Sequence, residues 1–330
     1  MKAAIQPTFH DRVEPLIEGA AICFQKISKK YFLFNLAFAF LVTCETLLIG
    51  FFFSPLVDTY FLGIAIALLF FTLLLYFILR LYYHEQKPEE FTQLRDEFIS
   101  TCKDFSPFGK NSSEHHLALA SACCRMKERL AESELSFYKV PEKFSFLAPI
   151  IEKAVSRFHL ADIHKMQELF LCSSIDEHVK LIKREPTSLD AHAATANAYV
   201  MLSALYHNPK TLKNISSKKL HELKRKHRLA TQSALEEFKI LSEYAPFDPW
   251  VHEQLALSFH NLQMPKEEIA EYETILTLRP NDLDTLSTLG LLYFNQGEQA
   301  KGLKIYEKLK ERDAQKAEEL IQNYGKLVIN

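Results

Sequence analysis

Glycine is scarce in this sequence, with 8 residues in 330. Alternation of apolar and polar residues, which marks half-buried β-strands, is also scarce. Both absences argue against a β-rich domain and favour an all-α protein. The net charge of −2 shows no excess of either sign, so it gives no support to a nucleic-acid-binding protein.

Motifs of catalysis and cofactor binding are absent as well. The chain contains no P-loop, G-x-S-x-G, H-E-x-x-H or dinucleotide-binding fingerprint. His115, His116, Cys123 and Cys124 stand seven to nine residues apart, whereas metal ligands on one helix usually recur at three or four. The sequence therefore predicts no enzyme, no cofactor and no metal.

Cysteine spacing gives no sign of a disulfide or a metal framework, because no C-x-x-C pair occurs. With most of the chain expected in a reducing compartment, we predict free thiols at all six positions. They are Cys23, Cys44, Cys102, Cys123, Cys124 and Cys172.

Two long apolar runs stand out near the start of the chain. Tyr31–Phe53 has 23 residues with a single charge, Glu45, and Tyr60–Leu79 has 20 residues with none. About 20 residues suffice for a helix to cross a hydrocarbon core of roughly 30 Å. We predict a transmembrane helical hairpin over residues 31–83, with Ser54–Thr59 as its turn. The alternative is a hairpin buried in a soluble core.

Basic residues indicate the orientation of this hairpin. Lys26, Lys29 and Lys30 precede it and Arg80 and Lys87 follow it, while the turn has no Lys or Arg. The positive-inside rule then predicts an integral membrane protein with two spans and both termini in the cytoplasm. A cleaved signal peptide fits poorly, because its apolar region would be shorter and nearer the first residue.

Glu45 is the one acid within the predicted spans. A carboxylate at that depth is costly and normally faces protein rather than lipid. Folding of the hairpin brings Glu45 near the depth of Leu68–Thr72. We predict a role in membrane assembly, through a hydrogen bond to Thr72 or to another subunit.

Amphipathic helices flank the hairpin on both sides. Residues 1–30 contain an apolar stripe, and this helix either lies in the membrane interface or packs on the soluble domain. A helix is predicted to start at Pro88, with a stripe of Phe91, Leu94, Phe98 and Cys102. Further helices are expected over about 114–135, 144–158 and 161–183. This region, 88–185, is interpreted as an unassigned helical region or as degenerate repeats.

The last part of the chain repeats. Pro246 and Pro280 are 34 residues apart, and the residues after each follow the same apolar and small-residue pattern. The same phase fits after Pro186, with 26 extra residues between the two helices of that unit. The pattern resembles the tetratricopeptide repeat (TPR), with Glu268 and Ala314 as departures at a small and a closing-proline position.

This resemblance implies an α-solenoid over residues 187–330, with repeats at about 187–248, 249–282 and 283–316 and a capping helix near Ala317–Tyr324. The family binds protein partners on the concave surface formed by the first helix of each repeat. On that surface the resemblance places Asn197, Trp250, Glu253, Leu257, Leu291 and Phe294. Ala193 stands where a chaperone-tail clamp needs lysine, so the resemblance does not imply binding of chaperone tails. The expected groove is apolar and mildly acidic, which suits a helix or an extended peptide with apolar anchors.

The insertion 207–228 is strongly basic and is expected to form a solvated helix extension or to contact a polyanion or anionic lipid. The residues proposed for that contact are Lys218, Lys219, Lys224, Arg225, Lys226 and Arg228. Nucleic acid is disfavoured because no aromatic residues alternate with these cations.

The leading hypothesis is a membrane-anchored adaptor that recruits a protein or peptide to the cytoplasmic membrane surface. One alternative is an assembly factor or chaperone-like subunit of a membrane or secretion complex. A second is a membrane enzyme with its site in 88–185. The hairpin also resembles that of chlamydial inclusion-membrane proteins, and a bacterial inner-membrane protein is the alternative location. A homo-oligomer is compatible with each of these readings.

Overall fold

A computed structural model describes residues 9–53, 60–109, 112–132, 148–207 and 216–328 of the chain. Regular structure in these residues is α-helical, which confirms the all-α prediction. The chain forms two compact units, residues 1–177 and 178–330.

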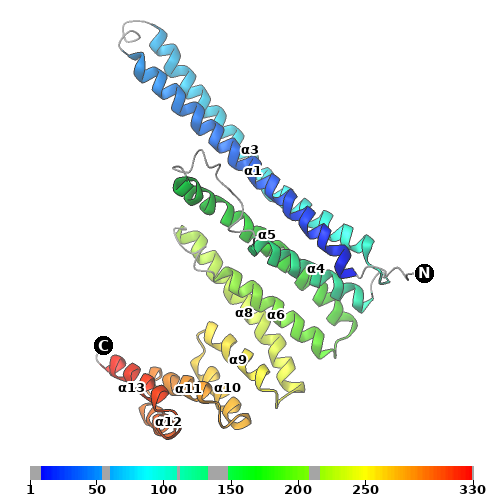
Figure 1. Cartoon of the computed structure of the whole chain (residues 1–330), viewed down its shortest axis with the longest axis vertical. Coiled ribbons are helices and arrows are strands. Elements are labelled where there is room, and N and C mark those ends of the chain that lie inside the picture. Colours follow the sequence, from blue (N-terminus) through cyan, green and yellow to red (C-terminus); the bar gives the residue numbers. More distant parts are fainter. Residues whose placement is uncertain (1–8, 54–59, 110–111, 133–147, 208–215, 329–330) are drawn as a thin grey trace, which may run out of the picture. The chain divides into compact units, whose positions relative to one another are not determined.

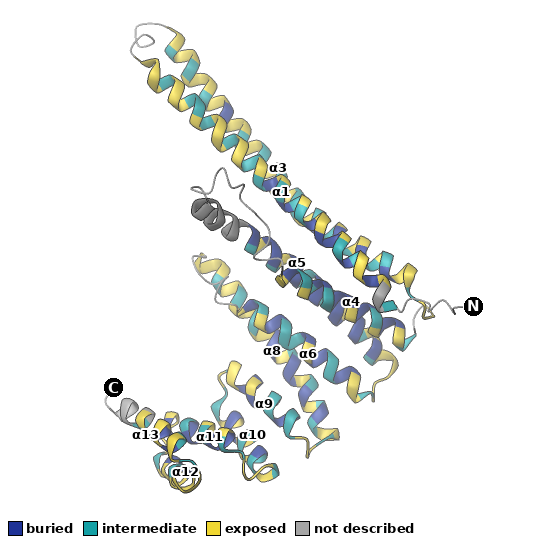
Figure 2. Cartoon of the chain, in the orientation of Figure 1, coloured by how far each residue is buried: buried dark blue, intermediate teal, exposed yellow. Residues whose placement is uncertain are grey.

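Two very long helices that lie side by side are the basis of the first unit, α1 (Phe9–Phe51) and α3 (Tyr60–Phe105) (Figure 1). One end of this pair is residues 31–53 and 60–83, which we call the apolar hairpin; the predicted turn, 54–59, lies outside the described residues. Its most apolar windows have mean hydropathies of 2.0 and 2.8, and 0% and 6% of their residues are buried. Both helices are therefore long and apolar enough to cross a membrane, and Figure 2 shows few buried residues at this end.

The other end of the same two helices forms part of a helical core, to which α4 (Ser113–Glu132) and α5 (Ala148–Arg184) also contribute. The N-terminal helix thus packs on the soluble bundle, which was one of the two alternatives. The buried core residues of these helices are Val13, Ile17, Ala20, Ala21, Phe24, Phe91, Leu94, Phe98, Cys102, Leu119, Ala122, Cys123, Met126, Leu130, Ile163, Met166 and Phe170.

Helix boundaries in this unit differ from the prediction in two places. No helix starts at Pro88, because α3 runs through this residue without a break. Proline removes one backbone donor from a helix interior, but the core contact of Phe91 and the apolar run before Pro88 support the helix on both sides. The helices expected at 144–158 and 161–183 are a single helix, α5.

Charged and aromatic side chains join α1, α3 and α5 where the apolar hairpin meets the bundle. Lys87 pairs with Asp162 at 2.6 Å, and its ammonium lies 5.2 Å from the ring centre of Tyr31. Lys30 pairs with Glu90 at 2.7 Å. Asp162 is buried, so loss of Lys87 would leave an uncompensated charge in the interior. These contacts fix the apolar hairpin to the bundle formed with α4 and α5.

The second unit consists of helical hairpins in tandem. α6 (Leu189–Tyr206) pairs with α8 (Ser217–Tyr244), α9 (Pro249–Asn261) with α10 (Pro265–Leu278), and α11 (Leu283–Asn295) with α12 (Gln299–Arg312). α13 (Ala314–Val328) packs on the last hairpin at the predicted position of the capping helix. Each hairpin coincides with one predicted repeat, which confirms a TPR-like α-solenoid.

Small residues allow the helices of each hairpin to approach closely. Ala196, Ala256 and Gly290 each stand eight residues after the N-cap of their helix and are buried. In the last hairpin a Cβ atom on Gly302 would lie 2.2 Å from the ring of Phe294. The ring therefore fills the space that glycine leaves in α12.

One polar contact recurs in two hairpins. His192 of α6 and His252 of α9 stand four residues after their N-caps, and each Nδ1 lies 2.6 Å from a carboxylate, that of Glu237 or Glu271. Each Nε2 lies 2.9 or 3.0 Å from the carbonyl of the proline before the helix. A carbonyl and a carboxylate both accept, so both ring nitrogens donate and the ring is held as an imidazolium.

The pair α4 and α5 in the first unit has a matching contact. His116 stands four residues after Ser112, whose hydroxyl caps α4, and its Nδ1 lies 2.6 Å from Glu177. Ala120 occupies the small position, and its carbonyl accepts a hydrogen bond from Ser174 at 3.1 Å. This register supports the interpretation of 88–185 as containing a degenerate repeat.

The His–Glu pairs predict a pH-dependent stability. Burial lowers the pKa of His192, whereas its hydrogen bonds to Glu237 and to the proline carbonyl raise it. The hydrogen bonds outweigh burial, so this pKa lies above its ordinary 6.5. The pKa of His252 is raised for the same reasons. Stability from a raised pKa is fully present below the unfolded-state pKa and is lost as the pH rises through the folded-state pKa. We expect the Tm of the full chain in detergent to fall between about pH 6 and about pH 9.

The last hairpin provides the control for this experiment, because Leu286 and Ile305 occupy the positions of the His and the Glu. His192→Leu combined with Glu237→Ile copies that natural apolar pair. The fall in Tm between the two pH values, measured by circular dichroism, should be smaller in this variant. An equal fall in both proteins would contradict the imidazolium assignment.

Glycine substitutions test the packing of the last hairpin. Gly302→Ala places a methyl group against the Phe294 ring, and such overpacking costs about 1–3 kcal/mol, more than the roughly 1 kcal/mol that alanine gains in helix propensity. Gly19→Ala in α1 meets nothing within 4 Å and should stabilise. Chemical denaturation should show a lower free energy of unfolding for Gly302→Ala and a higher one for Gly19→Ala. A stabilising Gly302→Ala would contradict the close packing of Gly302 against Phe294.

Candidate partner-binding groove

The first helices of the three hairpins present equivalent positions on one face. Asn197, Leu257 and Leu291 each stand nine residues after the N-cap of their helix. Asn197 and Leu257 are exposed and Leu291 is half-buried. Equal phase on stacked helices places these side chains in one row. We call this row, with the cavity beside Leu257, the groove.

The cavity has a volume of about 200 Å³ and lies between α6, α8 and α9. Pockets for drug-sized ligands measure roughly 300–1,000 Å³, so this one suits a single side chain of a partner. It is lined by Val200, Ser203, Ala204, His207, His227, Thr231, Ala234, Leu257, Ser258 and Asn261.

Hydrogen bonds fix the polar wall of the cavity. The Nδ1 of His227 lies 3.1 Å from the carbonyl oxygen of Ser203 and 2.8 Å from its hydroxyl. That hydroxyl lies 2.7 Å from the hydroxyl of Thr231, which donates to the His227 carbonyl at 3.0 Å. Because a carbonyl only accepts, the Nδ1 of His227 must donate. The other ring nitrogen, Nε2, takes no part in these hydrogen bonds.

Acids near the groove are paired with bases. Glu253 accepts from Arg279 at 2.8 Å, and Asp284 pairs with Lys316 at 2.6 Å. Both pairs are exposed, and such pairs contribute little to stability. They nevertheless neutralise the acidic character that the sequence alone indicated for this surface.

Phe294 and Trp250 differ from the other predicted groove residues. Phe294 is 2% exposed, with its ring against Gly302 and 4.8 Å from the ring of Tyr324, so a partner in the groove could not contact it. Phe294 is therefore removed from the predicted set of groove residues. Trp250 is half-buried and packs edge-on against Phe238 at 5.8 Å, as expected of a structural contact.

The second part of the basic insertion belongs to α8. From Ser217 onward its residues form the N-terminal end of α8, capped by Ser216, while 208–215 lie outside the described residues. Lys226 is half-buried, with its ammonium 5.6 Å from the ring centre of Tyr206. The other five predicted cations are exposed: Lys218, Lys219, Lys224, Arg225 and Arg228. Contact with a polyanion or anionic lipid stays a prediction.

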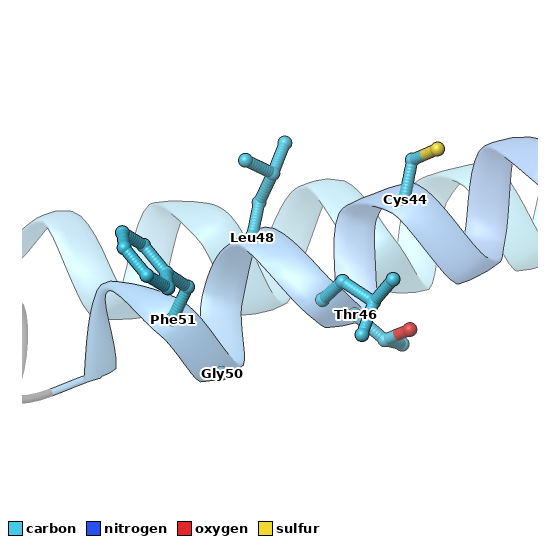
Figure 3. Close-up of a pocket in the computed structure, with 6 residues that line it drawn as sticks. Cys44, Thr46, Leu48, Gly50 and Phe51 are labelled. Carbon is cyan, nitrogen blue, oxygen red and sulfur yellow. The ribbon is translucent and has the colours of Figure 1, made fainter.

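Within the apolar hairpin the structure places Glu45 beside Thr72, whose hydroxyl donates to a carboxylate oxygen at 2.9 Å. A hollow of about 720 Å³ nearby is lined by Cys44, Thr46, Leu47, Leu48, Gly50 and Phe51, all from α1. Figure 3 shows Cys44, Leu48 and Phe51 projecting from one helix. The lining of this hollow comes from one apolar helix and not from several converging elements.

Titratable groups in the middle region pair with neighbours. The four residues considered for a metal have separate partners: His115 bonds to Ser106, His116 to Glu177 and Cys124 to Ser174, and Cys123 is buried. Among the described residues, no group of three His, Cys, Asp or Glu could hold a metal ion.

Perturbed pKa values do occur at the junction of the hairpin and the bundle. Burial, reinforced by Lys87 and Lys29, lowers the pKa of His159 to about 4. Burial also raises the pKa of Asp162, and Lys87 offsets this only in part. Burial in a packed junction is the main cause of both shifts, so they give no positive support to an enzyme.

No family model and no curated protein matches this sequence. Among solved structures, a similar one is the crystal structure of the P58(IPK) TPR domain. It is 13% identical, and the match covers 94% of this chain and 98% of that chain with a TM-score of 0.25. A TM-score this low shows poor superposition of the whole chains, so the repeat is established by the hairpins described above. The resemblance to chlamydial inclusion-membrane proteins stays a prediction.

Sequence reasoning missed the polar cavity and the His–Glu pairs. The sequence places His192 and His252 six residues after Pro186 and Pro246, but it does not indicate what either ring contacts. Their partners lie 45 and 19 residues further on, and the difference of 26 is the number of extra residues between the two helices of the first repeat. Removing the insertion before aligning the repeats would have brought Glu237 and Glu271 into register.

Proposed function

We propose that this chain is a membrane-anchored adaptor. The apolar hairpin spans a membrane, both ends of the chain lie on its cytoplasmic side, and the groove of the second unit binds a protein segment. A binding role is consistent with a TPR-like solenoid, since such repeats present extended surfaces to partners.

The observation that supports anchoring most directly is the exposure of the apolar hairpin. In a soluble hairpin these side chains would be packed, yet Phe40, Leu47, Phe70 and Phe77 are 58–70% exposed. Exposed apolar surface of this extent needs a nonpolar environment. The hairpin is also a direct continuation of the bundle helices, so a membrane would hold the whole chain at its surface.

Anchoring is tested by membrane extraction. Lysine costs about 3 kcal/mol at the centre of a spanning helix, so lysine at Phe40, Leu47, Phe70 and Phe77 together should prevent insertion. We expect the native chain to remain in the membrane pellet after alkaline carbonate washing and the variant to be released.

A matched control places four lysines on exposed apolar residues of the second unit, Leu229, Tyr244, Phe247 and Leu303. This control should remain in the pellet. Release of the native chain, or retention of the hairpin variant, would show that the hairpin is not the anchor.

Partner binding is tested with photo-crosslinking residues in native membranes. Probes at Asn197, Leu257 and Leu291 lie along the groove, and a probe at Leu303 on α12, the second helix of its hairpin, is the control. We expect one discrete protein to crosslink from the groove positions and not from Leu303. Equal crosslinking at all four positions, or none at any, would contradict recruitment through this surface.

A further inference from the structure

We propose that the cavity between α6, α8 and α9 receives the side-chain carboxylate of an aspartate or glutamate from the partner, with His207 and His227 as its donors. This inference rests on the proposed partner-binding function of the groove and specifies the chemistry of its anchor. An acidic anchor is not expected from the apolar and mildly acidic surface that the sequence indicated.

Geometry supports two donors at one point of the cavity. The rings of His207 and His227 lie 5.0 Å apart, come from different helices and both line the cavity. The Nδ1 of His227 is already committed to Ser203. A proton gained by this ring therefore goes to Nε2 and converts it from an acceptor to a donor.

Charge in and around the cavity favours an anion. Among the described residues, its lining contains no Asp, Glu, Lys or Arg, and the two histidines are its titratable groups. On α8, Lys224 stands three residues before His227, on the same side of the helix, and is exposed. A carboxylate that enters meets a cation on this side, whereas a basic side chain would be repelled.

Size favours a single acidic side chain over a larger anion. The cavity of about 200 Å³ also has an apolar part, formed by Val200, Ala204 and Leu257. The methylene groups of aspartate or glutamate can pack there while the carboxylate reaches the histidines. Hydrogen bonds between charged partners are roughly twice as strong as neutral ones.

Proton linkage follows from this arrangement. Histidine changes its charge between about pH 5 and about pH 8, and only the imidazolium donates from both nitrogens. The titratable and charged groups on the side of His227 are His207, at the C-cap of α6, and Lys224 of α8. The lining residues of α9 are Leu257, Ser258 and Asn261, none of which titrates. Binding of a carboxylate should therefore be tighter at low pH.

The test uses the full chain in detergent and a positional-scanning library of hexapeptides. The peptides are acetylated and amidated, so that their only carboxylates are side chains. We expect one position at which Asp or Glu binds about tenfold better than Asn or Gln at about pH 6, with a smaller ratio at about pH 8.

His227→Asn is the informative variant, because the amide nitrogen of asparagine can replace Nδ1 as the donor to Ser203 while the Nε2 position is lost. The acid preference should disappear in this variant while apolar preferences remain. His221→Asn, on the same helix but outside the cavity lining, is the matched control and should keep the acid preference.

The outcomes distinguish a failure of the acidic anchor from a failure of the groove as a binding site. Peptides that bind with no acid preference at any position would overturn this inference and leave the groove as a binding site. An acid preference that persists in His227→Asn would overturn the assignment to this cavity. No binding by any peptide would count against both the inference and the proposed function of the groove.

Discussion

The first unit depends on one constraint, the continuity of α1 and α3 from the apolar hairpin into the bundle core. Each helix is apolar on all sides near the turn and apolar on one stripe further away. The same two helices therefore provide both the exposed apolar surface and part of the buried core. The apolar hairpin built in this way cannot rotate freely against the bundle, because both helices continue through the junction, even though Pro88 lacks one backbone donor.

Charge at the junction reinforces this continuity. The Lys87–Asp162 pair and the Lys30–Glu90 pair lie beside aromatic rings, where apolar surface and charge meet. These lysines are among the residues from which the orientation of the hairpin was inferred. Their ion pairs show that the same lysines also contribute to the packing of α1, α3 and α5.

In the second unit the corresponding constraint is the close approach of the two helices of each hairpin. A small residue at one position permits it, and a His–Glu or Leu–Ile pair nearby fills the interface. His192 and His252 additionally bond to the chain segment before their helix, so they tie each hairpin to the preceding connection. The groove results from this stacking, since equivalent positions of successive helices then form one row.

The sequence by itself determined the helical class, the extent of the apolar hairpin and the phase of the repeats. These follow from composition and periodicity, which report local structure and the burial of one helix face. Asn197, Leu257 and Leu291 could be placed on one face through the resemblance to the tetratricopeptide repeat. Only the tertiary structure decided what each side chain meets there. The burial of Phe294 depends on Gly302 and Tyr324, and the cavity at His227 depends on three helices separated along the chain. Contacts between distant segments have no period in the sequence, so neither could be predicted from it.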